Sequence, residues 1–175
     1  LRKALKDNDL RGYIPKMPTL LCGGNNDPTV FYDVNTGSMS AILQQANASP
    51  SVNLNITVLD VDTTNDDDRD QNTVTAIGSA MSNAWMSTDI IDNIQSRFAT
   101  KVQSVQTTAY TNAYKAAYAT AIQAGNDQAQ ANALAVESAT RAAGAAFLSN
   151  YHGELVSTAC TQAAREFFKQ DFERS

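Results

Sequence analysis

The chain has 175 residues, with 18 acidic and 13 basic side chains and a formal net charge of -5 at pH 7. This is the length of one ordinary domain. The acidic balance, without any cluster of Lys or Arg, argues against nucleic acid and anionic membrane as partners. No apolar stretch is long enough for a transmembrane helix and no signal peptide is recognisable. A surface rich in Asn, Gln, Thr and Ser favours a periplasmic or secreted protein, but a chain that begins at Leu1 leaves the localisation unknown.

The first third of the chain has the pattern of a strand, a helix and a second strand. Residues 1–10 have the spacing of the end of a helix. Residues 17–22 form an apolar run that ends at two glycines, which is typical of a buried parallel strand. Residues 36–46 fit a short helix, and residues 54–61 alternate and are rich in β-branched side chains, which predicts a second strand.

The rest of the chain reads as helical. A polar, acidic loop is expected over residues 63–72. From about residue 74 to 148 the composition shifts to Ala, Gln, Thr, Tyr and Asn with helical spacing, and Gly125-Asn126-Asp127 marks a turn, so we expect a long antiparallel helical hairpin. Residues 154–172 place their apolar side chains on one face, which predicts a final helix that packs on the sheet.

Two short motifs could carry chemistry. Asp27 follows the first predicted strand, in the acidic loop of residues 23–30, and His152, the only histidine, precedes the last predicted helix. A strand, then Gly-x-x-Asp-x-x-Val, then a second strand, then a His before the last helix is the order in which α/β-hydrolases present their acid and base. Over about half of its length the chain therefore resembles the C-terminal part of an α/β-hydrolase-fold serine hydrolase of the esterase, lipase or prolyl-oligopeptidase kind.

The resemblance implies an α/β fold that contains the C-terminal portion of a hydrolase sheet, with two parallel strands, and a large Ala-rich helical hairpin insertion. Residues 1–62 would form the first segment of the core, residues 63–150 a helical lid or cap, and residues 151–175 the loop of the base and the final core helix. It also implies cleavage of an ester or amide bond by acyl transfer, with Asp27 as the acid and His152 as the base of a Ser-His-Asp triad. No cofactor or metal is implied.

The identity of the acid stays open in the sequence. Asp33, Asp60 and Asp62 are fallback acids, and Asp62 at the end of the second strand is the nearest rival to Asp27. If Asp27 is the acid, its loop and that of His152 leave the same end of a parallel sheet, and the two side chains should lie within hydrogen-bonding reach.

The nucleophile is missing, because Gly-x-Ser-x-Gly does not occur. Gly37-Ser38-Met39-Ser40-Ala41 lacks the second glycine and follows no predicted strand. The resemblance implies that the serine and the oxyanion donors belong to the remaining N-terminal half of the hydrolase, upstream in the same polypeptide or on a cleaved chain, and that the substrate is a small-molecule ester. The alternative is a non-enzymatic helical interaction or assembly module.

Two further features suggest no site. Cys22 and Cys160 are too few for a disulfide framework and have no metal-ligand spacing, so we expect two reduced, buried thiols. The acidic run that begins at Asp66 fails the EF-hand pattern because Gln71 stands where a glycine is needed, which favours a solvated loop.

Overall fold

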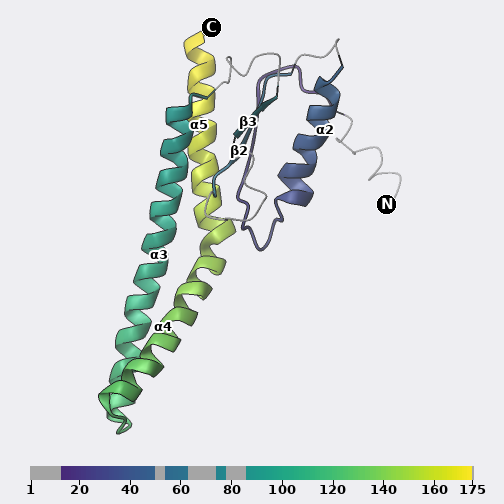
Figure 1. The fold of residues 1–175 in the computed structure, drawn as a ribbon. Helices are drawn as coiled ribbons and strands as arrows, with labels where there is room; N and C mark the ends of the chain where they lie inside the picture. Colours follow the sequence, from purple (N-terminus) through teal and green to yellow (C-terminus); the bar gives the residue numbers. More distant parts are fainter. Residues whose placement is uncertain (1–12, 50–53, 63–73, 78–85, 175) are drawn as a thin grey trace.

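A computed structural model describes residues 13–49, 54–62, 74–77 and 86–174. This part of the chain is mostly helical, with a small sheet at one end, and is a mixed α/β fold (Figure 1). The predicted helix end at residues 1–10, the loop at residues 63–72 and its acidic run lie outside the described residues. The elements, with η for a π-helical turn, are β1 (Thr19–Gly23), η2 (Asp33–Gly37), α2 (Ser38–Asn47), β2 (Ile56–Asp60), β3 (Val74–Ile77), α3 (Thr88–Gln123), α4 (Gln128–Asn150), η5 (Tyr151–Val156) and α5 (Ser157–Arg174).

The sheet contains the two parallel strands that the sequence predicts and one more. β1 and β2 pair in parallel from Thr19 opposite Ile56 to Gly23 opposite Asp60. β3 pairs antiparallel with the other edge of β2. The expectation of helix from about residue 74 was therefore wrong for β3. Its four residues are too few for apolar periodicity to separate strand from helix, and pairing with β2 decides.

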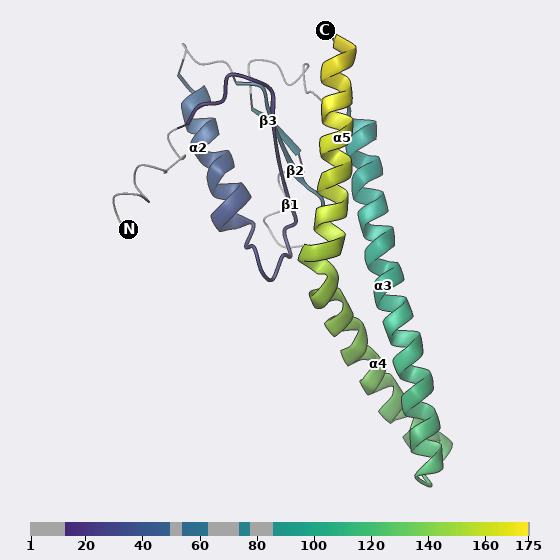
Figure 2. The same ribbon diagram turned by 180° about the vertical axis from the view of Figure 1, so that it is seen from behind.

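Helices cover both faces of the sheet, with α2 on one face and α3 and α5 on the other (Figure 2). On the α2 face, Leu43 packs with Ile56 and Val58. On the opposite face, Leu59 and Val61 of the sheet region join the larger apolar core contributed by α3, η5 and α5. All five residues of β2 are buried, as expected for a strand covered on both faces.

The predicted helical hairpin is confirmed. α3 and α4 contain 36 and 23 residues and lie antiparallel. The turn between them uses Gly125 at a φ of 86°, which glycine adopts without strain, and Asp127 begins α4 with a capping box to Gln130. In both views the far half of the hairpin extends beyond the end of the sheet at which η5 lies. Among the described residues, no helix combines the length and the hydropathy needed to cross a membrane.

α4, η5 and α5 follow one another without a loop, so the expected loop of the base is instead a π-helical turn. The wider turn accommodates an extra residue. It buries Tyr151, Leu155 and Val156 and leaves His152 on the exposed side.

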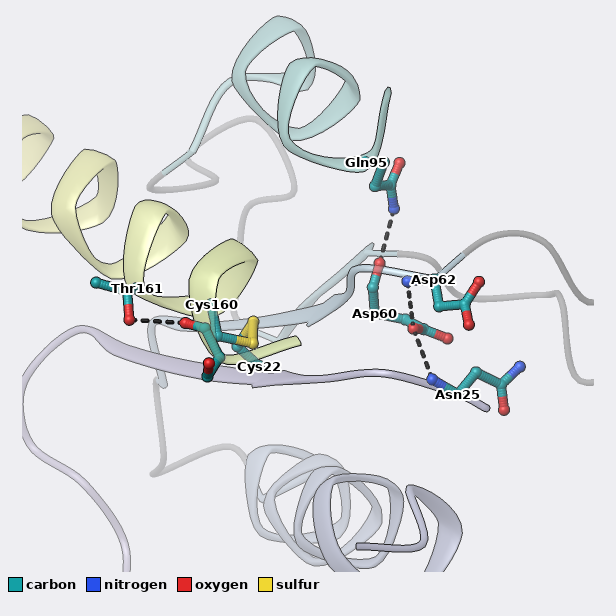
Figure 3. Close-up of a disulfide and its surroundings, with 8 residues drawn as sticks. Cys22, Asn25, Asp60, Asp62, Gln95, Cys160 and Thr161 are labelled. Atoms are coloured by element: carbon teal, nitrogen blue, oxygen red, sulfur yellow. Dashed lines mark hydrogen bonds between the residues drawn. A yellow bond between two sulfur atoms is a disulfide. The ribbon is translucent and has the colours of Figure 1, made fainter. Parts of the chain in front are cut away.

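The two cysteines form a disulfide, and the expectation of reduced, buried thiols was wrong. Cys22 on β1 and Cys160 on α5 are joined across 138 positions of sequence, with their Cα atoms 5.6 Å apart (Figure 3). Both side chains are only partly buried. The count and spacing of cysteines could not reveal this pairing, because it depends on α5 packing beside β1, which brings the Cα atoms into the range of a disulfide.

Candidate active site

Asp27 lies in the loop that follows β1, and its own turn fixes its carboxylate. The backbone N–H of Asp27 donates to the carbonyl of Gly24 at 3.2 Å. Oδ1 accepts hydrogen bonds from the backbone N–H groups of Thr29 at 2.8 Å and Val30 at 2.9 Å. With Oδ1 held in this way, Oδ2 has a defined direction.

His152 lies where Oδ2 points, so the expected proximity of the two side chains is confirmed. The distance from Nδ1 of His152 to Oδ2 of Asp27 is 2.6 Å. The Asp27 side chain is 3% exposed, whereas that of His152 is 49% exposed. A carboxylate beside Nδ1 favours a proton on that nitrogen, which leaves the lone pair of a neutral imidazole on Nε2. Nε2 makes no hydrogen bond to any residue that the structure describes.

The surroundings of Asp27 favour its charged form. Burial by itself raises the pKa of the carboxyl group. The backbone N–H of Val30, the hydrogen bond with His152, the N–H of Thr29 and the charge of His152 act in the opposite direction, and together they hold the pKa below its ordinary value of 3.8. Asp27 is therefore a carboxylate at neutral pH and an acceptor for Nδ1–H.

Asp60, the rival acid at the end of β2, holds the neighbouring backbone. Oδ1 of Asp60 accepts from the backbone N–H of Asn25 at 3.1 Å and of Asp62 at 2.9 Å, and Gln95 of α3 donates to the Asp60 carbonyl at 2.8 Å (Figure 3). The third fallback acid, Asp33, begins η2. Asp27 is the acid that the structure brings to the imidazole.

Tyr151 belongs to the site, although the sequence did not single it out. The side chain is fully buried, and its hydroxyl accepts from the backbone N–H of Asn26 at 2.9 Å and donates to Oδ2 of Asp62 at 2.5 Å. Burial, the hydrogen bond to Asp62 and the negative charges of Asp62 and Asp60 raise the pKa of Tyr151 far above its ordinary value. The hydroxyl thus stays protonated. The only sequence signal was its place directly before His152.

Gly24 lets the loop of the acid reach the π-helical turn. A Cβ atom on this residue would lie 2.6 Å from Cγ2 of Val156 and 2.7 Å from the hydroxyl oxygen of Tyr151. Both distances are far below normal contact, so a larger residue would push the loop away from η5.

Among the described residues, no serine hydroxyl or free thiol forms a hydrogen bond with the imidazole of His152. Ser38 begins α2, where its hydroxyl donates to the carbonyl of Asp33, and Ser40 is buried in the same helix. Both cysteines are in the disulfide. No group of side chains in this part of the chain could hold a metal ion.

The fold and the site together define a mixed α/β protein with a buried carboxylate hydrogen-bonded to a half-exposed imidazole. Scans against protein-family models, curated proteins and solved structures found no match to the chain. A functional assignment therefore depends on the geometry of the site.

Proposed function

We propose that the chain supplies the acid and the base of a Ser-His-Asp serine hydrolase of α/β-hydrolase type, which cleaves an ester or amide bond by acyl transfer. The observation that carries this proposal is the 2.6 Å contact between Asp27 Oδ2 and Nδ1 of a half-exposed His152 side chain. In this role Nε2 accepts the proton of an attacking serine, Asp27 stabilises the imidazolium, and the imidazolium then protonates the leaving group.

The serine and the oxyanion donors would come from a segment outside the described residues, on the same polypeptide or a second chain. The order of the described strands supports this arrangement, because β1 is at an edge of the sheet and is only partly buried. A further strand added parallel to β1 would end beside the loop of Asp27. In open α/β sheets, the carboxyl ends of neighbouring parallel strands are where reacting groups meet.

A fluorophosphonate probe, which reacts covalently with an activated serine, tests the proposal on the intact protein. We expect labelling of the wild type, and a fall in labelling rate of about 10³-fold or more in His152→Gln, because the base is lost. Glu154→Gln is the matched control on the same turn, because it removes an exposed carboxylate that pairs with Lys101 at 3.1 Å. Equal labelling of wild type and His152→Gln would contradict a role for His152 as the base.

A second candidate function is a helical interaction or assembly module. The observation in its favour is a set of exposed apolar side chains on the hairpin, at Ile122, Leu134, Val136 and Leu148. These could cover a substrate as a lid, or contact a partner protein. No reaction with the serine probe, together with concentration-dependent association that is lost when these residues become polar, would favour this function over the hydrolase.

A further inference from the structure

We infer that Tyr151 is the positioning residue of the Asp27–His152 pair, since its hydroxyl ties the loop of the acid to the turn that carries the base. Only the catalytic consequence of this inference rests on the proposed function. The structural part, that Tyr151 holds Asp27 and His152 in position, depends on the contacts of the buried Tyr151 hydroxyl.

Tyr151 joins the immediate neighbours of the two site residues. It directly precedes His152 in η5, and its hydroxyl accepts the backbone N–H of Asn26, the residue directly before Asp27. The acid and the base are 125 positions apart in sequence. This hydrogen bond therefore fixes the distance between two segments that no local structure connects.

Packing fixes the ring that carries the hydroxyl. Phe98 of α3 and Phe147 of α4 contact the Tyr151 ring edge to face, with centroid distances of 5.9 and 5.0 Å. No part of the residue is exposed. Because two helices confine the ring, the position of the hydroxyl is fixed. The hydrogen bond to this hydroxyl therefore sets the position of the loop.

Asp62 fixes the direction of the hydroxyl hydrogen. Oδ2 of Asp62 accepts from the Tyr151 hydroxyl and also from Nδ2 of Asn26 at 2.8 Å. Because the hydroxyl donates to Asp62, a lone pair of its oxygen faces the backbone N–H of Asn26. Tyr151 and Asp62 thus hold Asn26 by its main chain and its side chain.

The consequence for His152 is a choice of tautomer. The Nδ1–H form is favoured only while Oδ2 of Asp27 stays in line with the ring. Without the hydrogen bond to Tyr151, the loop that carries Asp27 keeps its internal turn but can move as a unit. This movement weakens the contact between Asp27 and His152. Tyr151→Phe removes one oxygen from the buried ring and should leave the fold in place.

The test uses ¹⁵N-histidine NMR, with the signal of His152 assigned by its loss in His152→Gln. In wild type we expect the proton of the neutral ring on Nδ1. In Tyr151→Phe we expect the ratio of the Nδ1–H to the Nε2–H form to fall about tenfold, the effect of one hydrogen bond. Tyr114→Phe is the matched control, because it also loses one tyrosine hydrogen bond, to Asn132 at 2.7 Å in the hairpin, and it should behave as wild type.

Activity gives a second readout. On an ester substrate of the intact protein, Tyr151→Phe should lower kcat about tenfold and leave KM unchanged, because the variant affects the base and not the binding of substrate. An unchanged tautomer ratio and an unchanged kcat in Tyr151→Phe would overturn the inference.

Two further outcomes separate the possible failures. If Tyr151→Phe does not fold, Asp62→Leu removes both acceptor oxygens in a side chain of similar size, and the same direction of tautomer change is expected. An unchanged ratio in Asp62→Leu would then overturn the inference. If the wild type has the Nδ1–H form and Tyr151→Phe loses it, but no serine is labelled, the positioning role stands and the proposed hydrolase function fails.

Discussion

At the scale of the residue, the two carboxylate oxygens of Asp27 make separate hydrogen bonds. Oδ1 accepts from the backbone of its own turn, and Oδ2 faces Nδ1 of His152. Asp27→Asn can keep the turn through its amide oxygen but presents an NH₂ group to the imidazole. His152 must then carry its proton on Nε2, where it cannot act as a base. We expect turnover to fall by about 10⁴-fold in a variant that still folds, measured by steady-state kinetics and circular dichroism. A loss of less than tenfold would show that Asp27 does not orient the base.

The lowered pKa of Asp27 also predicts how stability depends on pH. Because the pKa of the folded state lies below the ordinary value of 3.8, the charged carboxylate stabilises the fold at all pH values above 3.8. This contribution decreases as the pH falls below 3.8 and is lost once the pH passes the folded-state pKa. Urea unfolding of wild type and Asp27→Asn should therefore show a difference in stability at pH 7 that shrinks below pH 3.8. A difference that grows toward low pH would contradict the direction of the shift.

At the scale of the element, the close approach of the β1 loop to η5 depends on Gly24. In Gly24→Ala the new methyl group would overlap Val156 and the Tyr151 hydroxyl, so we expect a loss of about 1 to 3 kcal/mol in the free energy of unfolding and a weaker Asp27–His152 contact. Gly144→Ala in α4 is the control. Its methyl group would meet nothing within 4 Å, and the higher helix propensity of Ala should add about 0.5 to 1 kcal/mol. Urea denaturation measures both values. Equal effects of the two substitutions would count against the proposed crowding at Gly24.

The hairpin offers a prediction that separates a lid from an inert extension. Ile94, Phe98 and Val102 of α3 belong to the main core, whereas the far half of the hairpin extends beyond the sheet. Removing residues 108–140 and closing the gap with a short Gly-Ser linker should therefore preserve the core. If the hairpin shapes access to the site, the ratio of kcat/KM for long and short acyl esters should change severalfold with little loss of stability. An unchanged ratio would favour the assembly role.

The sequence was informative where periodicity extends over many residues. The two long helices, their turn at Gly125 and the two parallel strands were predicted because each repeats a simple pattern or ends at a clear signal. β3 was missed because it is short and depends on its partner strand. The π-helical form of η5 was missed because it arises from burying Tyr151, Leu155 and Val156 on one turn, which is a matter of tertiary packing.

For the candidate site, the sequence predicted the pair but not its support. Asp27 and His152 stand in motifs whose order can be recognised. The supporting hydrogen bonds join three separate segments, through Tyr151, Asn26 and Asp62. No local sequence pattern predicts contacts of this kind. The roles of these residues depend on how the folded chain brings these segments together.

At the scale of the whole molecule, the Cys22–Cys160 disulfide closes most of the described chain into one covalent loop. Such a cross-link restricts the unfolded chain, and for a loop of this length we expect a contribution of about 2 to 5 kcal/mol. Reduction should lower the melting temperature of the wild type. The double variant Cys22→Ser and Cys160→Ser should melt at this lower temperature with or without a reducing agent. A wild type whose melting temperature does not respond to reductant would contradict this contribution.

The same disulfide also sets an order of events during biosynthesis. Cys160 is made 138 residues after Cys22, which corresponds to a delay of roughly 7 to 28 s at ribosomal rates of about 5 to 20 residues per second. For that time Cys22 has a free thiol on a strand whose covering helix does not yet exist. Closure must follow the synthesis of α3, α4 and η5, so the disulfide can form only after the part of α5 that carries Cys160 has been made and lies beside β1.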